Sequence, residues 1–152
     1  MRTTSSIVAA AVFLAGSTVV WASRPEPGHM SRHGTEADIE DLDAEIRWDG
    51  EKWRLSVEYD VEIENAGGGE SFDLVLSLFD KRGRNTPVQI TVQLVQPTEV
   101  DDNEVEYEST VEARIDASLV GDPTRLRLRG MVVYRGGGIV LDEKETSVDH
   151  KR

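Results

Sequence analysis

Apolar and polar side chains alternate strictly through residues 53–64, which read WRLSVEYDVEIE. The odd positions are Trp, Leu, Val, Tyr, Val and Ile, whereas the even positions are Arg, Ser, Glu, Asp, Glu and Glu. A period of two is typical of a β-strand with one face in the core and the other in water. A shift by one residue would bury the carboxylates, so the register of this strand must be tightly fixed.

The same alternation recurs in six more segments, separated by turns rich in Gly, Asp, Asn and Pro. No helical period longer than one turn is present. Seven strands within residues 38–148 predict an all-β domain, a seven-stranded antiparallel β-sandwich of Ig-like or fibronectin-III-like architecture. The chain has no Cys, so it lacks the Cys…Trp…Cys signature of antibody domains. The six further segments are residues 41–48, 71–80, 88–96, 104–116, 124–134 and 139–147.

An Asp-Gly dipeptide at positions 49 and 50 joins the first two expected strands. This dipeptide favours a two-residue hairpin turn, which would set Glu45 opposite Arg54. A four-residue turn would instead set Asp43 opposite Glu58, and like charges directly opposite each other are unfavourable. The sequence therefore favours the two-residue turn.

The first 22 residues have the pattern of a signal peptide. Arg2 precedes an apolar run at positions 7–20, and Val20 and Ala22 occupy the −3 and −1 positions of a cleavage site before Ser23. An uncleaved membrane anchor needs about 20 apolar residues, more than this run supplies. We therefore expect an exported protein, periplasmic or secreted, with a signal peptide at 1–22, a flexible Pro- and Gly-containing leader at 23–37, and a tail at 149–152.

The formal net charge of −12 limits the possible partners. Nucleic acid and anionic lipid headgroups are repelled by so negative a surface. We expect no nucleic-acid binding and no membrane span after signal cleavage, whereas a protein partner remains open.

Two expected strands, 53–64 and 104–116, place carboxylates on their solvent faces, and these strands are neighbours in Ig-like topology. A row of arginines on residues 124–134 would lie on the opposite sheet. The two faces could be ordinary solvated surface, could dock a protein partner, or could associate with each other. The candidate binding residues are Glu58, Asp60, Glu62, Glu106, Glu108, Arg125, Arg127 and Arg129.

Catalytic signatures are few. There is no Cys, no Gly-x-Ser-x-Gly and no phosphate loop, and the three histidines, His29, His33 and His150, lie in the expected leader and tail. The carboxylates occupy solvent faces, where nothing is expected to raise their pKa. We therefore expect neither an enzyme nor a bound cofactor.

Two segments carry possible metal ligands. The loop of Asp101, Asp102, Asn103 and Glu104 offers the oxygens that Ca²⁺ prefers, but it lacks the spacing and the glycine of an EF-hand. It is a weak calcium candidate. His29, Met30 and His33 could bind a copper-like ion, but they lie in the expected leader, whose composition does not fix ligand geometry.

Trp48 and Trp53 flank the expected hairpin turn. Exposed tryptophans could stack on sugar rings, but strand parity favours both pointing inward to cap one end of the core. The sequence thus predicts an exported, non-catalytic binding or structural module that contacts a protein partner, with a calcium- or carbohydrate-binding accessory domain as the alternative.

Overall fold

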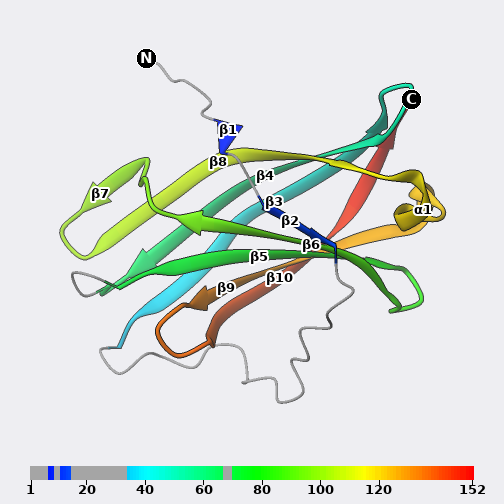
Figure 1. The fold of residues 1–152 in the computed structure, drawn as a ribbon. Helices are drawn as coiled ribbons and strands as arrows, with labels where there is room; N and C mark the ends of the chain where they lie inside the picture. The colour runs from blue at the N-terminus through cyan, green and yellow to red at the C-terminus, as the bar shows by residue number, and fades with distance from the viewer. Residues whose placement is uncertain (1–6, 9–10, 15–33, 67–69) are drawn as a thin grey trace.

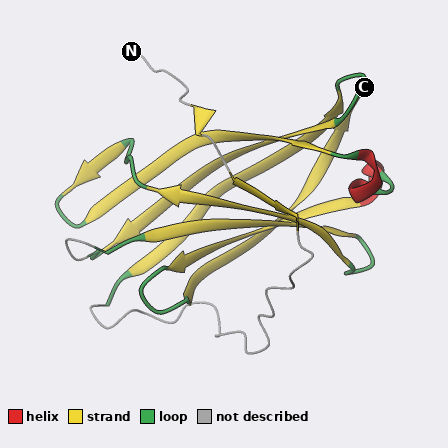
Figure 2. Cartoon of the chain, viewed as in Figure 1, coloured by secondary structure: helices red, strands yellow, loops and turns green. Residues whose placement is uncertain are grey.

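The computed structural model describes residues 7–8, 11–14, 34–66 and 70–152. It is almost entirely β-structure, which confirms the all-β expectation. The one α-helix in this part of the chain, α1, has four residues and is followed by a 3-10 turn, η1 (Figure 2). The elements are β1 (Ile7–Val8), β2 (Ala11–Leu14), β3 (Glu36–Trp48), β4 (Trp53–Glu64), β5 (Phe72–Asp80), β6 (Asn85–Leu94), β7 (Glu99–Asp101), β8 (Glu104–Ile115), α1 (Ala117–Val120), η1 (Pro123–Arg125), β9 (Leu126–Tyr134) and β10 (Ile139–Lys151).

All ten described strands belong to one continuous sheet, in the order β1-β8-β4-β3-β10-β9-β5-β6-β2, with β7 beside β8. The sheet curls so that β3, β4 and β8 lie across from β5, β6 and β9 (Figure 1). The first part of β10 pairs antiparallel with β9, and its last residues pair in parallel with β3. β10 therefore joins the two halves of the fold.

This topology corrects the expected seven-stranded antiparallel Ig-like sandwich. The structure has more strands, two parallel pairs and no separation into two sheets among its described residues. Alternation predicts which face of a strand is buried, but it does not say which strands are neighbours. β10 has 13 residues, so it is long enough to pair with β9 at one end and β3 at the other.

The core forms between the two halves from the apolar positions of the alternating strands. Leu55, Val57, Val61 and Ile63 of β4 are fully buried, as predicted. Burying each large side chain contributes about 1.5–3 kcal/mol. β5 lies between β9 and β6, and its Val75 is buried on the outer face with Met131, Val133 and Val140. β5 is therefore a central strand of the sheet.

The hairpin between β3 and β4 has four residues between the Trp48–Trp53 pair, so the preference for a two-residue turn is wrong. Asp43 does lie opposite Glu58. The like-charge argument failed because the turn has its own stabilising contacts. The Asp49 carboxylate accepts hydrogen bonds from the backbone amides of Glu51 and Lys52, at 3.0 and 2.8 Å.

Several strands extend beyond their expected bounds. β3 begins at Glu36, inside the expected leader, and β10 continues to Lys151, through the expected tail, because His150 pairs with Ile46 of β3. β7 was not expected. Its three residues are too few for alternation to identify a strand.

β1 and β2 lie within the predicted signal peptide. β1 pairs in parallel with β8, and β2 pairs antiparallel with β6. The rest of residues 1–22, and the leader up to residue 33 with both of its histidines, lie outside the described residues. Signal cleavage stays a prediction. Among the described residues, no helix is both long and apolar enough to cross a membrane.

Candidate functional site

The outer surface of β3, β4, β8 and β7 carries carboxylates at directly opposite cross-strand positions. The outermost row runs Glu36, Glu64, Glu104 and Asp101, one residue from each strand. Residues directly opposite in an antiparallel pair share a face. We name this surface the acidic face; it consists of Glu36, Asp38, Glu40, Asp41, Asp60, Glu62, Glu64, Glu99, Asp101, Glu104, Glu106 and Glu108.

The expected neighbouring of the acidic rows of β4 and β8 is confirmed, since Asp60 lies opposite Glu108 and Glu62 lies opposite Glu106. The contribution of β3 was missed because residues 36 and 37 were assigned to the leader and the first strand was expected to begin only at residue 41. The alternation of Glu36 and Asp38 with Ala37 and Ile39 was the signal that could have revealed it.

Glu62 lies at the centre of this face. Ligand oxygens of Glu40, Glu62 and Glu106 lie within 4.8 Å of one another, and so do those of Glu62, Glu64 and Glu104. One carboxylate therefore belongs to two groups of three. Five glutamates on three strands converge on one small region.

An irregularity of β3 between Ile39 and Asp41 contributes Glu40 to the first group. Two side chains of β10 form hydrogen bonds with the backbone of this irregular segment. The Ile39 amide donates to Asp142 Oδ2 at 2.7 Å, and Lys144 Nζ donates to the Glu40 carbonyl at 3.2 Å. A bulge that re-aims a side chain in this way is a common device near binding sites.

The crowding of carboxylates changes their protonation. Hydrogen bonding with Glu40, partial burial and the charges of Glu104 and Glu40 raise the pKa of Glu62 to about 8. Burial, hydrogen bonding with Glu106 and the surrounding negative charges raise the pKa of Asp60 to about 6. The expectation that nothing raises a carboxylate pKa on this surface is wrong, because it treated each carboxylate as isolated in water.

Little positive charge lies beside this cluster: among the described residues, Lys144 Nζ donates to the Glu40 carbonyl and not to a carboxylate. No lysine or arginine described here forms an ion pair with a carboxylate of the acidic face. Asp60 Oδ1 is buried and has no hydrogen-bond partner in the same part of the chain. The acidic face thus combines converging oxygens, shared protons and a buried acceptor, which together suit a cationic ligand.

The remaining acidic candidates lie beside this centre or at its rim. Glu58 is exposed and lies between Asp43 and Thr110, outside both groups of three. In the candidate calcium loop, the Asp102 amide donates to Asp101 Oδ1 at 2.9 Å. Glu104 alone of the four loop residues joins a converging group. Calcium binding by the loop itself stays a prediction.

The arginine row lies on the other half of the fold, as expected. Arg127 and Arg129 lie on β9, and Arg125 lies on η1. Arg129 forms an ion pair with Glu145 at 2.9 Å, and its guanidinium lies 5.1 Å from the centre of the Phe79 ring. Because acidic residues of β10 compensate Arg129, this arginine is less available for docking than the acidic face.

The two tryptophans differ in burial. Trp48 and Trp53 pack edge to face, with ring centroids 5.1 Å apart, and Trp53 also contacts His150. Trp53 packs against the core as expected, but 44% of Trp48 is exposed. The expectation that Trp48 is a core residue is therefore wrong. It occupies the last position of β3, where the core ends.

No protein-family model and no curated protein matches this chain. Three solved structures of Bacteroides uniformis β-glucuronidase show partial likeness. A calcium-binding mutant of β-glucuronidase 2 is 15% identical over 79% of this chain and 14% of its own, with a TM-score of 0.43. The same enzyme bound to cyclophellitol-6-carboxylate aziridine is 16% identical over 78% and 13%, with a TM-score of 0.44. A B. uniformis β-glucuronidase is 15% identical over 78% and 13%, with a TM-score of 0.41.

Proposed function

We propose that this protein is a non-catalytic binding module whose acidic face binds divalent cations, with calcium as the preferred ion. The observation that carries this proposal is the position of Glu62 in two groups of three carboxylates, each with its oxygens within 4.8 Å. Calcium accepts six to eight oxygen ligands in a flexible geometry, whereas magnesium demands a near-ideal octahedron. Long glutamate side chains on an open sheet suit the flexible geometry better.

The raised pKa values support the same ion. At neutral pH, Glu62 holds a proton because its charge is unfavourable beside Glu40 and Glu104. A divalent cation reverses this preference, since its ligands must be deprotonated. Cation binding at pH 7 is therefore expected to release about one proton from Glu62.

We propose binding without catalysis because the acidic face presents only carboxylates on an outer sheet surface. Acyl transfer would require a nucleophile paired with a base and an orienting group, and glycosyl transfer, for which two carboxylates suffice, would require them to flank a substrate cleft. Export is part of the same proposal and is supported by the signal-peptide pattern of residues 1–22. Extracellular calcium modules work at dissociation constants of about 10⁻⁴–10⁻³ M, an affinity that an open site of this kind can reach.

The test is a calcium titration followed by thermal melting at constant ionic strength. Calcium is expected to raise the Tm beyond the effect of matched NaCl, and Glu62→Gln is expected to remove the excess. Glu112→Gln is the matched control, because Glu112 is an exposed carboxylate on β8 opposite Ser56 and outside both groups. Equal stabilisation by calcium and matched NaCl, or an equal loss in both variants, would contradict the proposal.

A second candidate ligand is a basic segment of a protein partner. It is favoured by the width of the acidic face, which crosses four strands and is larger than one ion needs. A lysine- and arginine-rich peptide would then bind with an affinity that falls steeply with salt. Binding of the peptide that persists in a calcium chelator, with no calcium effect on the Tm, would favour the partner over the ion.

A further inference from the structure

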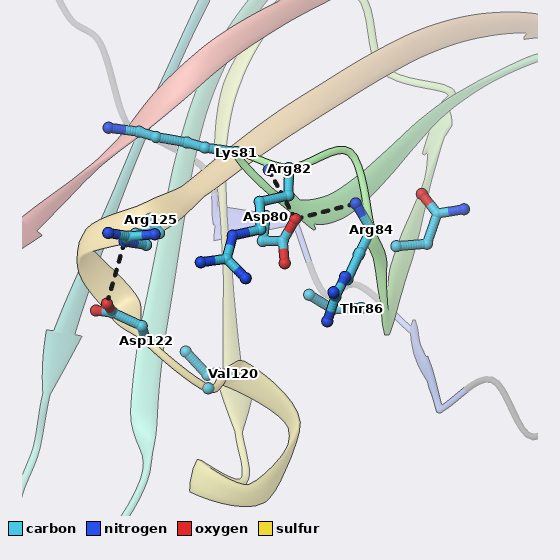
Figure 3. Close-up of a pocket in the computed structure, with 10 residues that line it drawn as sticks. Asp80, Lys81, Arg82, Arg84, Thr86, Val120, Asp122 and Arg125 are labelled. Carbon is cyan, nitrogen blue, oxygen red and sulfur yellow. Dashed lines mark hydrogen bonds and ion pairs between the residues drawn. The ribbon is translucent and has the colours of Figure 1, made fainter.

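A cavity of about 530 Å³ opens at the end of β5 and β6, between their connecting turn and the segment that contains α1 and η1. Its size falls in the range of small-molecule pockets. The lining mixes polar and apolar surface; four of its ten residues are basic, and Val120 is its apolar side chain (Figure 3). The basic residues are Lys81, Arg82, Arg84 and Arg125.

The charge of this pocket is opposite to that of the molecule. Four cationic side chains line it together with two acids, Asp80 and Asp122, whereas the whole chain carries −12. Asp80 is already engaged, since its Oδ1 accepts from the backbone amides of Arg82 and Arg84 at 2.9 and 3.0 Å. The pocket therefore has an excess of positive charge with free donors.

Asp122 is engaged as well. It accepts from the hydroxyl and amide of Thr124 at 2.7 and 3.0 Å, and these bonds hold its pKa below the ordinary value. Its ion pair with Arg125 is long, at 3.7 Å. Within the residues that the structure describes, Arg82 and Arg84 form no ion pair.

Backbone hydrogen bonds fix the two walls relative to each other. The Lys81 amide donates to the Arg125 carbonyl at 2.9 Å, which ties the β5–β6 turn to η1. Within the turn, the Asp80 amide donates to the Arg84 carbonyl at 2.9 Å. Figure 3 shows the guanidinium groups of Arg82 and Arg84 on the Val120 side of the turn, with Lys81 extending away from them.

We propose that this pocket binds a doubly charged oxyanion, a phosphate or sulfate group carried by a small molecule. Guanidinium groups bind such groups through two parallel hydrogen bonds, and three of them approach one cavity here. This site uses none of the residues of the acidic face, so anion binding goes beyond the proposed cation binding. The two proposals can be tested independently of each other.

The test titrates inorganic phosphate, sulfate and acetate separately into the protein at pH 7.5 and fixed ionic strength, followed by amide chemical shifts and calorimetry. Saturable binding of phosphate or sulfate is expected, with shifts at residues 80–86 and 120–125. The double variant Arg82→Ser, Arg84→Ser is expected to bind at least about tenfold more weakly. Arg135→Ser is the control and is expected to bind unchanged, because Arg135 is exposed and pairs with Asp73, at the opposite end of β5 from Asp80.

Comparison of the anions identifies the source. Tighter binding of phosphate or of sulfate supports the proposal and names the ester class to examine next. Non-saturable shifts, equal weakening by Arg135→Ser, or acetate binding as tight as both dianions would overturn it. The melting temperature of the double variant verifies folding, because both arginines lie on an exposed turn and none of the core is changed.

Discussion

Glu62 of β4 lies directly opposite Glu106 of β8, and a carboxylate oxygen of each lies within 4.8 Å of the other. Two like charges in this relation are unfavourable unless a proton or a cation lies between them. The fold maintains the pair because Val61 and Ile63, the buried neighbours of Glu62, fix the register of β4. Core packing thus forces together the carboxylates that the proposed function uses.

The first prediction concerns pH. The pKa of Glu62 is raised from 4.5 to about 8 and that of Asp60 from 3.8 to about 6, so the folded state binds more protons than the unfolded state between these values. Stability therefore falls as pH rises from about 4.5 to 8. Thermal melting in calcium-free buffers is expected to show a lower Tm at pH 8 than at pH 5.5. Glu62→Gln is expected to flatten this dependence, whereas Glu112→Gln keeps it.

Asp49 and Asp122 act in the opposite direction at lower pH. Hydrogen bonds from the backbone amides of Lys52 and Glu51 lower the pKa of Asp49, and hydrogen bonds from Thr124 lower that of Asp122. Their stabilisation is present above their unfolded pKa and is lost as pH falls through the folded one. Stability is therefore expected to pass through a maximum at acidic pH, where the loss from Asp49 and Asp122 meets the gain from protonation of Glu62 and Asp60. A Tm that rises steadily from pH 5 to 8 would contradict the assigned shifts.

The second prediction concerns salt. The acidic face places carboxylates opposite one another on four strands, and screening at 1 M salt shortens the Debye length to about 3 Å. NaCl is expected to raise the Tm by several degrees at pH 8, where Glu62 is about half charged. At pH 5 the effect is expected to be smaller because protons already separate the carboxylates. A Tm that does not change with salt at either pH would show that repulsion on this face is negligible.

The faces of the strands followed from the sequence because burial imposes a period of two. Every even position of residues 54–64 is excluded from the core, and the odd positions from Leu55 to Ile63 are buried. The sequence also predicted that the two acidic rows are neighbours. This was right because β4 and β8 pair in this fold as they would in an Ig-like sandwich.

The remainder depended on contacts that no local pattern encodes. The parallel pairing of β10 with β3 joins residues about a hundred positions apart, and it decides that the sheet is continuous. Two local details also escaped the sequence. One is the amide-accepting Asp49 side chain, which stabilises a four-residue turn, and the other is the irregularity at Ile39, which brings Glu40 to Glu62.

The third prediction tests the facing of β4. Val57 is fully buried, whereas its neighbour Glu58 is exposed. Val57→Asp is expected to unfold the domain, because an unpaired buried carboxylate costs about 3–5 kcal/mol or more, comparable with the total stability of a domain. Glu58→Ala is expected to fold with an unchanged or slightly higher Tm. Far-ultraviolet circular dichroism with thermal melting measures both, and equal melting temperatures would show that the facing is reversed.

The fourth prediction concerns the N-terminus. Mass spectrometry of the exported protein is expected to give a chain that begins at Ser23, because Val20 and Ala22 form the cleavage site.

Cleavage removes β1 and β2, which pair with edge positions of β8 and β6. Among the residues whose burial the structure describes, the buried apolar ones all lie between Ile39 and Val148, so the chain from Ser23 is expected to fold with a Tm within a few degrees of the full chain. It gains a free edge at residues 88–91 of β6, a site for strand pairing with another chain. Size-exclusion chromatography over a concentration series is therefore expected to show more self-association for the shorter chain. A mass that includes residues 1–22 would rule out cleavage, and an unfolded shorter chain would show that β1 and β2 are essential parts of the domain.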